Sequence, residues 1–162
     1  MSLATRVAVM EGGAIAQVGT PREVFHHPRS EFVARFVGIR NFYQGRLEPP
    51  AAGMGGLSRF VTHGHAFAVL TDAAPGPGSL FFRSEDVSIS LTHPNSSARN
   101  CFMGSVVDIV PARLGVEILV DVGVEVAVLV TEESRRDLQL DFGRKVWISF
   151  KATAPRFVED LS

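Results

Sequence analysis

Short apolar runs separated by glycines predict a β-hairpin at the start of the chain. Residues 6–10 and 14–18 are both mainly aliphatic, and Glu11, Gly12 and Gly13 stand between them. Glycines at a tight turn between two strand-like runs are typical of a hairpin. We therefore expect two antiparallel strands in this segment.

Two helices are predicted after the hairpin from their capping residues. Thr20 supplies an N-cap hydroxyl, Pro21 the first helical position and Glu23 the third, which is the pattern of a capping box. Ser30 caps a second helix over residues 31–37, whose apolar face consists of Phe32, Val33, Phe36 and Val37. Because a hairpin and two short helices bury little apolar surface, we expect residues 4–40 to be the end of a larger domain.

From residue 41 onward the pattern changes to short strands in which apolar and polar positions alternate. Residues 116–122 and 124–130 flank Gly123 as a second hairpin, and residues 104–110 and 145–151 supply two more strands. One brief helix, capped by Thr131, interrupts them. Several short strands with one brief helix predict a mainly β fold, a small barrel of the OB type over residues 41–158, preceded by a short α/β remnant.

A faint internal repeat divides the barrel region. Asn41 and Gly45 recur as Asn100 and Gly104 at the same spacing, and the strand end Phe82-Arg83 resembles Phe150-Lys151. Two strand sets, residues 41–90 and 96–158, would then be copies of one unit. The alternative is that strands with a glycine near their start look alike without any duplication.

Composition is that of a globular protein and excludes several classes of function. The hydrophobic fraction is 46%, and 16 Lys+Arg against 17 Asp+Glu give a net charge of −1, so no basic excess draws the chain to nucleic acid. No apolar run approaches the roughly 20 residues that span a bilayer. The single cysteine, Cys101, can form neither an internal disulfide nor a thiolate metal cluster. We expect a cytoplasmic protein that does not itself span the membrane.

Sequence motifs for catalysis and for metal binding are missing from the chain. It has no G-x-x-x-x-G-K-[ST] loop, no G-x-S-x-G turn and no H-E-x-x-H helix. His63-Gly64-His65 could hold a metal only weakly, and a solvated turn explains it better. We therefore expect no catalytic residues, no metal site and no ATP hydrolysis by this chain.

Two motifs near the ends of the second strand set are Ser97-Ala98-Arg99-Asn100 and Phe150-Lys151-Ala152-Thr153. The segment that they bound resembles the molybdate/tungstate-binding module called the Mop or TOBE domain. The run from Phe82 to Val87 is similar to the Arg-Pro-Glu-Asp-Val signature of TOBE domains, with Ser84 in place of the usual proline. The resemblance implies an OB-like fold for this part of the chain.

Residues 6–38 resemble the end of an ABC transporter ATPase domain, with Gly19-Thr20-Pro21 opening its helix and residues 32–38 similar to the linker into TOBE. The order is that of an importer's ATP-binding subunit, so we expect this chain to be its C-terminal part. The resemblance implies that the full-length parent is a transport ATPase, with ATP and Mg²⁺ bound only there. It also implies a homodimer, permease subunits as partners, and a peripheral position on the inner face of the plasma membrane.

The resemblance further implies an oxyanion site, because in this family the two segments meet at a subunit or subdomain interface. The matching donors are the side chains of Ser97, Arg99 and Lys151, the backbone amides of Ala98 and Asn100, and the flanking hydroxyls of Ser96 and Thr153. Molybdate or tungstate, as a tetrahedral oxyanion, needs such converging donors. The alternative is that Arg99 and Lys151 are merely solvated while Ser97 caps a turn.

Arg83 is the cation that corresponds to Lys151 in the first half of the repeat. No Ser-Ala-Arg-Asn run precedes the strands of that half. We therefore do not expect a second oxyanion site there.

Two functions follow from the resemblance. One is the oxyanion-sensing, regulatory C-terminal region of a molybdate/tungstate importer's ATP-binding subunit, in which bound oxyanion holds the ATPase domains apart. The other is a structural dimerisation TOBE domain of an importer for another solute, such as sulfate, iron or a sugar. A free-standing molybdate storage protein is disfavoured by the ATPase-like first forty residues.

Overall fold

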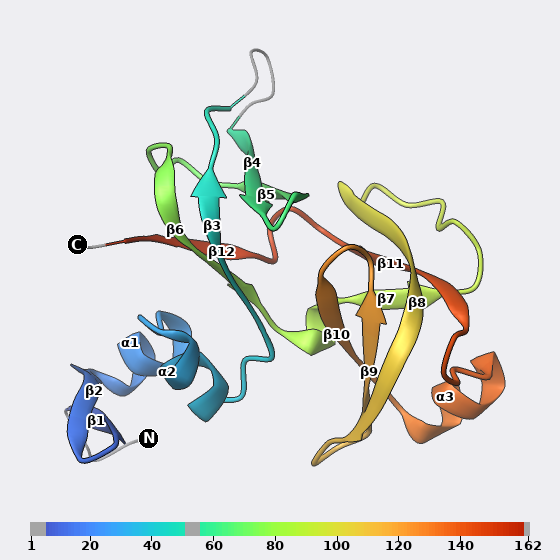
Figure 1. Ribbon diagram of the computed structural model, residues 1–162, viewed down its shortest axis with the longest axis horizontal. Coiled ribbons are helices and arrows are strands. Elements are labelled where there is room, and N and C mark those ends of the chain that lie inside the picture. Colours follow the sequence, from blue (N-terminus) through green and yellow to red (C-terminus); the bar gives the residue numbers. More distant parts are fainter. Residues whose placement is uncertain (1–5, 51–55, 161–162) are drawn as a thin grey trace.

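The computed structural model describes residues 6–50 and 56–160. At its N-terminal end, strands β1 (Val7–Glu11) and β2 (Ala14–Gly19) form an antiparallel hairpin, followed by helices α1 (Pro21–His26) and α2 (Glu31–Phe36). Figure 1 shows this unit below the rest of the molecule on the left. The predicted caps are present, since Thr20 and Ser30 each accept a hydrogen bond from the backbone amide three residues on.

Helix α2 buries a different face from the one expected. Val33 and Ala34 are fully buried, whereas Phe32 is 37% and Phe36 67% exposed. Val33 packs with Val9 and Val24 of the hairpin and α1, and Ala34 packs with Ile39 and Phe81 at the start of the barrel. The two phenylalanines lie outside both clusters because the helix is shared between these two small cores.

The rest of the chain forms two five-stranded antiparallel sheets. The first sheet has the order β12-β6-β3-β4-β5. Its strands are β3 (Asn41–Leu47), β4 (Leu57–Thr62), β5 (His65–Leu70), β6 (Gly76–Phe82) and β12 (Arg156–Glu159).

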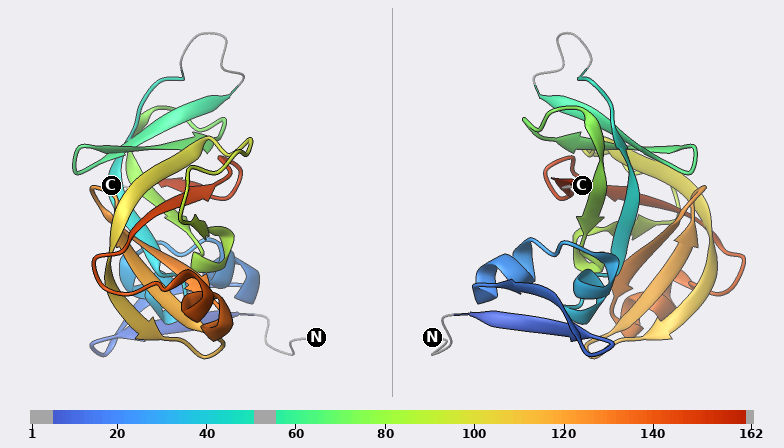
Figure 2. Two further views of the ribbon diagram at one scale, coloured as in Figure 1. Left: turned by 90° about the vertical axis from the view of Figure 1, so that its right-hand side faces the viewer. Right: turned by 60° about the vertical axis from the view of Figure 1, so that its left-hand side comes forward.

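The second sheet has the order β10-β9-β8-β11-β7. It consists of β7 (Ser88–Ser90), β8 (Asn100–Pro111), β9 (Val116–Asp121), β10 (Glu125–Val130) and β11 (Lys145–Phe150), with helix α3 (Glu132–Leu138) between β10 and β11. The long strand β8 curves across this sheet (Figure 2). The mainly β fold predicted from the sequence is confirmed.

The two sheets have the same order of strands, with their last strands exchanged. Reading β3, β4, β5 and β6 onto β8, β9, β10 and β11 superposes the two orders, and the edge strand beside β6 is then β12 while the edge strand beside β11 is β7. Each half therefore donates its final strand to the sheet of the other half. The short 3₁₀ turn Ser84–Asp86 carries the chain from β6 across to β7.

Equivalent asparagines fasten the two halves together. The side chain of Asn41 exchanges two hydrogen bonds with the backbone of Ala127 on β10, at 3.0 and 2.8 Å, and Asn100 does the same with Ala68 on β5, at 2.8 and 2.7 Å. Both asparagines are buried, so these bonds satisfy polar groups away from water. This reciprocal geometry supports the duplication that we propose for residues 41–90 and 96–158.

Glycine is required at the same place in each half. At Gly45 a Cβ would collide with the backbone oxygen of Val61, and at Gly104 with that of Asp121, which lie on the neighbouring strands β4 and β9. The repeated Asn-x-x-x-Gly pattern therefore has one physical explanation in both halves: a buried side-chain amide and a close approach of backbones.

One hydrophobic core joins the sheets, and aromatic rings lie at its centre. Phe67 and Phe82 from the first half pack against Phe102 and Phe150 from the second. Val146, Ile148 and Phe150 of β11 are all buried, as the alternation predicts.

Candidate functional site

A cavity of about 650 Å³ lies between the end of β11 and the loop that leads into β8. Five of the residues expected from the sequence line it: Ser96, Ser97, Ala98, Lys151 and Thr153. The two segments that carry them are far apart in the sequence and converge because β8 and β11 are hydrogen-bonded neighbours, with Asn100 opposite Phe150.

The serines lie in the loop between β7 and β8. Ser96 Oγ accepts a hydrogen bond of 3.2 Å from the backbone amide of Ala98, so this amide is already used within the loop. The side chains of Ser96 and Ser97 are exposed, and the hydroxyl hydrogen of each can be donated to an anion. The loop therefore offers hydroxyl donors more readily than the Ala98 amide that the sequence suggested.

Lys151 and Thr153 lie in the turn that follows β11. This turn is closed by a hydrogen bond of 3.0 Å from the Ala154 amide to the Lys151 carbonyl, and the Ala152 carbonyl accepts another of 2.9 Å from the Leu70 amide. The backbone is thus held at both ends while the Lys151 ammonium remains exposed. A lysine with this placement offers a point charge to an anion without any rearrangement of the main chain.

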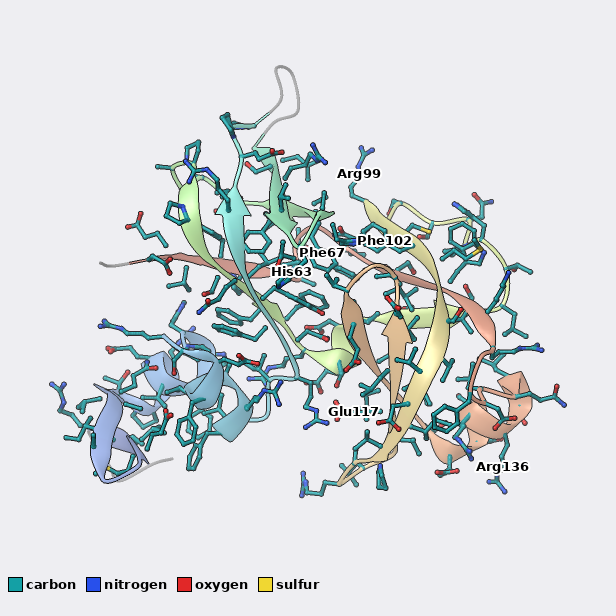
Figure 3. The ribbon with its side chains drawn as sticks, in the orientation of Figure 1. His63, Phe67, Arg99, Phe102, Glu117 and Arg136 are labelled. Carbon is teal, nitrogen blue, oxygen red and sulfur yellow. The ribbon has the colours of Figure 1, made fainter. Side chains whose placement is uncertain are left out.

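Arg99 and Asn100 lie outside this cavity. Arg99 is exposed, and its side chain points away from the body of the molecule beyond the start of β8 (Figure 3). Asn100 is 0% exposed, and its amide group is committed to the backbone of Ala68. Within one chain, therefore, neither side chain joins the serines and Lys151.

Two charged residues that the sequence analysis did not single out also line the cavity. They are Asp86, from the 3₁₀ turn after β6, and Arg156, at the start of β12. Arg156 is the first residue of the four-residue strand β12. It reaches the cavity because β12 pairs with β6 in the first sheet, which no local pattern reveals. The charged lining is thus two cations and one carboxylate.

The two cations of the cavity are Lys151 and Arg156. Within residues 6–50 and 56–160, no ion pair shorter than 4.0 Å involves Lys151 or Arg156. By contrast, Arg40 pairs with the buried Glu117 at 2.9 Å, and Glu117 also accepts a hydrogen bond of 2.7 Å from Ser84. That network is structural, since it ties the linker before β3 to β9.

Tyr43 and His65 lie at the junction of the halves, away from this cavity, and burial shifts the pKa of each. Burial raises the pKa of Tyr43, whose hydroxyl donates a hydrogen bond of 2.6 Å to the Glu125 carbonyl. Burial lowers the pKa of His65, whose ring packs on Phe67 and Phe102. His65 thus belongs to the aromatic core, and among the described residues no three His, Cys, Asp or Glu side chains gather to hold a metal ion.

A family model described as the TOBE domain matches residues 96–155, which include both segments of the cavity. These residues therefore form a TOBE domain, and the resemblance noted from the motifs is confirmed.

Relatives extend the similarity over almost the whole chain. Over 157 residues this chain is 32% identical to the molybdate/tungstate import ATP-binding protein WtpC of Pyrococcus abyssi, and the match covers 95% of this chain and 42% of that protein. It is also 32% identical over 137 residues to the spermidine/putrescine import ATP-binding protein PotA of Trichormus variabilis, covering 80% of this chain and 35% of that protein. A sulfate/thiosulfate import ATP-binding protein, CysA of Burkholderia mallei, is 37% identical over 94 residues, or 57% of this chain and 24% of that protein. The chain is thus related to importer ATP-binding proteins and spans less than half of their length.

A solved structure shares the fold. The cytoplasmic molybdate-binding protein ModG, in a form with molybdate bound, matches with a TM-score of 0.60 and 20% identity, covering 76% of this chain and 98% of that one. No helix in the described part of the chain is long and apolar enough to cross a lipid bilayer.

Proposed function

We propose that this chain is the regulatory region of an importer ATP-binding protein of the molybdate/tungstate type, and that it binds the oxyanion in the cavity between the β7–β8 loop and the end of β11. One observation carries the proposal: hydroxyl donors of Ser96, Ser97 and Thr153 line a single cavity with the free ammonium of Lys151. The similarity to WtpC and the fold of ModG support molybdate or tungstate as the ligand.

The lining suits a tetrahedral dianion. Lys151 and Arg156 supply two positive charges and the hydroxyls supply neutral donors, which together satisfy several oxygens of the anion at once. Asp86 opposes binding, because its carboxylate repels the anion. With Lys151 and Arg156 it leaves a net charge of +1 on the lining. A second copy of the chain would add donors, and the exposed Arg99 is available for that role in a homodimer.

Regulation requires that the oxyanion prefer one state of the full-length transporter. In the proposed mechanism, bound oxyanion favours the state in which the ATPase domains are apart, and by linkage that state binds the oxyanion more tightly. In this proposal ATP and Mg²⁺ bind only to the full-length protein. Its partners are the permease subunits, and it lies at the inner face of the plasma membrane.

A second candidate function is a structural dimerisation domain in an importer for another solute. The similarity to PotA and CysA supports it, since those proteins are named for spermidine/putrescine and sulfate/thiosulfate. In that case the cavity binds no oxyanion tightly, and the β-region serves to pair two subunits.

Isothermal titration calorimetry of the chain with molybdate, tungstate and sulfate separates the two candidates. The sensing function predicts saturable binding of molybdate and tungstate. Tight binding of none of the three would support the structural alternative. Tight binding of sulfate alone would contradict molybdate and tungstate as the ligands. Sedimentation of the same samples at micromolar concentration tests the homodimer, which a purely monomeric mass would contradict.

A further inference from the structure

A second cavity, of about 420 Å³, lies where helix α1 meets the first sheet, and its lining is strongly basic. Arg22, His26 and His27 come from α1 and its C-terminal cap, Arg83 follows β6, and Arg156 begins β12. Asp86 is the single acidic residue among the described residues that line it. Arg22, His26, His27 and Arg83 belong neither to the proposed oxyanion site nor to the TOBE match, which covers residues 96–155.

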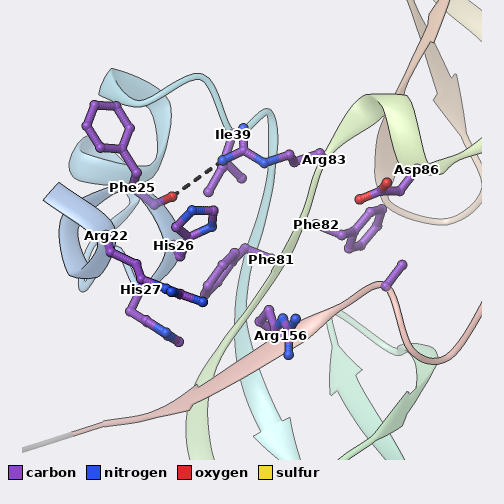
Figure 4. Close-up of a pocket in the computed structure, with 11 residues that line it drawn as sticks. Arg22, Phe25, His26, His27, Ile39, Phe81, Phe82, Arg83, Asp86 and Arg156 are labelled. Atoms are coloured by element: carbon purple, nitrogen blue, oxygen red, sulfur yellow. Dashed lines mark hydrogen bonds between the residues drawn. The ribbon is translucent and has the colours of Figure 1, made fainter. Parts of the chain in front are cut away.

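The basic side chains reach the cavity from opposite walls. Figure 4 shows Arg22, His26 and His27 on the α1 side and Arg156 on the sheet side, with the Phe81 ring between them. Phe81 is only 3% exposed and forms the floor. Arg83 donates a hydrogen bond of 3.4 Å to the Phe25 carbonyl, which places its guanidinium against the end of α1.

No internal partner neutralises these guanidinium groups. Across the described residues, Arg22, Arg83 and Arg156 take part in no ion pair within 4.0 Å. Three like charges around one cavity repel one another, and an anion placed among them removes that repulsion. Guanidinium groups also match the oxygens of a phosphate group in pairs, and imidazole N–H groups add further donors.

The position of the cavity follows from the repeat. It lies at Arg83 after β6, as the candidate oxyanion site lies at Lys151 after β11. In the second half the loop before β8 supplies hydroxyls. In the first half α1 supplies Arg22 and two histidines instead. The sequence did not reveal this site because its donors do not come from a Ser-Ala-Arg-Asn run.

We propose that this second cavity binds a phosphate group, either as inorganic phosphate or as a phosphomonoester, and that the bound group joins α1 to the first sheet. The volume lies within the range of small-molecule pockets, so the cavity accommodates an organic remainder beside the phosphate. Because Arg156 and Asp86 line both cavities, the two sites share charged groups.

Calorimetry of the full chain with inorganic phosphate and with methyl phosphate tests the proposal. Arg22→Ala should weaken binding about tenfold or more, as expected for a lost charge-assisted hydrogen bond. Arg113→Ala is the matched control, since Arg113 is equally exposed but lies in the β8–β9 loop, and it should bind as the wild type does. Tighter binding of inorganic phosphate would assign the free anion, and tighter binding of methyl phosphate would assign the monoester.

Three further variants separate this site from the candidate oxyanion site. Lys151→Ala should leave phosphate binding unchanged, whereas Arg156→Ala should weaken the binding of phosphate and of molybdate alike. Arg83→Ala should weaken phosphate binding. If loss of the Arg83 hydrogen bond to Phe25 impairs folding, the phosphate affinity of Arg22→Ala tests the proposal in its place.

Hydrogen exchange gives a second readout, because phosphate should slow exchange in residues 21–27 in the wild type and not in Arg22→Ala. Absence of phosphate and methyl phosphate binding at millimolar concentration overturns the proposal. So does equal binding by the Arg22→Ala and Arg113→Ala variants. Either result leaves molybdate binding at the other cavity to be judged on its own.

Discussion

Phe82 and Phe150 stack on each other with ring centroids 4.5 Å apart and an angle of 25° between the rings. They are the last residues of the equivalent strands β6 and β11, so the two halves of the repeat meet face to face at this pair. Each ring is followed directly by a cation, Arg83 or Lys151, and each cation lines a cavity. The aromatic pair therefore lies directly beside the cations of both candidate sites.

Replacing Phe150 with alanine should destabilise the whole chain. The side chain is buried against Phe67, Phe82 and Phe102, and a Phe→Ala change in such a core costs about 3–5 kcal/mol. Urea unfolding of Phe150→Ala measures the loss. Phe142→Ala is the control, because Phe142 is 69% exposed and its loss should change the free energy of unfolding by less than about 0.5 kcal/mol.

Asn100→Ala should reduce stability by about 1–3 kcal/mol, because it leaves the part-buried backbone groups of Ala68 without their side-chain partner. Asn41→Ala should behave alike through Ala127. Chemical unfolding checks both variants. If Asn100→Ala weakens oxyanion binding while stability stays unchanged, the structural role assigned to this side chain is wrong.

The stability of the fold should fall with acidification in part through His65. Burial lowers the pKa of this imidazole below its ordinary value of 6.5, so the unfolded chain takes up the proton first as the pH falls. Stability is therefore lost from about pH 6.5 downward. His65→Phe keeps a ring against Phe67 and Phe102 and should show a shallower loss between about pH 7 and 5. An equally steep loss of stability over this pH range in His65→Phe and in the wild type would contradict the assignment.

Lys151→Ala should lower oxyanion affinity by about ten- to a hundredfold, the equivalent of about 1.5–3 kcal/mol for one charge-assisted hydrogen bond. Ser97→Ala should lose less, about 0.5–1.5 kcal/mol, because its donor is neutral. Calorimetric titration with molybdate measures both. Lys145→Ala, at the other end of β11 and equally exposed, should bind like the wild type. An equal loss in Lys145→Ala would mean that general charge, and not the cavity, governs binding.

Local chemistry explains which parts of the fold could be predicted. The caps at Thr20, Ser30 and Thr131 depend on neighbours in sequence, and the structure confirms them. It also confirms the strands β9, β10 and β11, but β9 and β10 each bury three consecutive residues instead of alternate ones. The exchange of β7 and β12 depends on pairings between distant segments. A single short strand fits either sheet, so no pattern in residues 88–90 or 156–159 reveals its partner.

The same distinction applies to the candidate site. The resemblance to TOBE domains pointed to Ser97 and Lys151, and the pairing of β8 with β11 brings their segments to one cavity. Arg156 was missed because it enters the cavity only through the exchanged strand β12. For Asn100 the sequence predicted only a backbone amide donor. The structural role of its buried side chain, which fastens the two halves, could not be read from the motif.

Crystals grown with tungstate provide the most direct test of the proposed function, because tungsten can be located by its anomalous scattering. We expect a tungsten peak within hydrogen-bonding reach of Lys151 Nζ and the Ser97 hydroxyl, in the cavity between the β7–β8 loop and the end of β11. A tungsten peak elsewhere, with this cavity filled only by water, would contradict it.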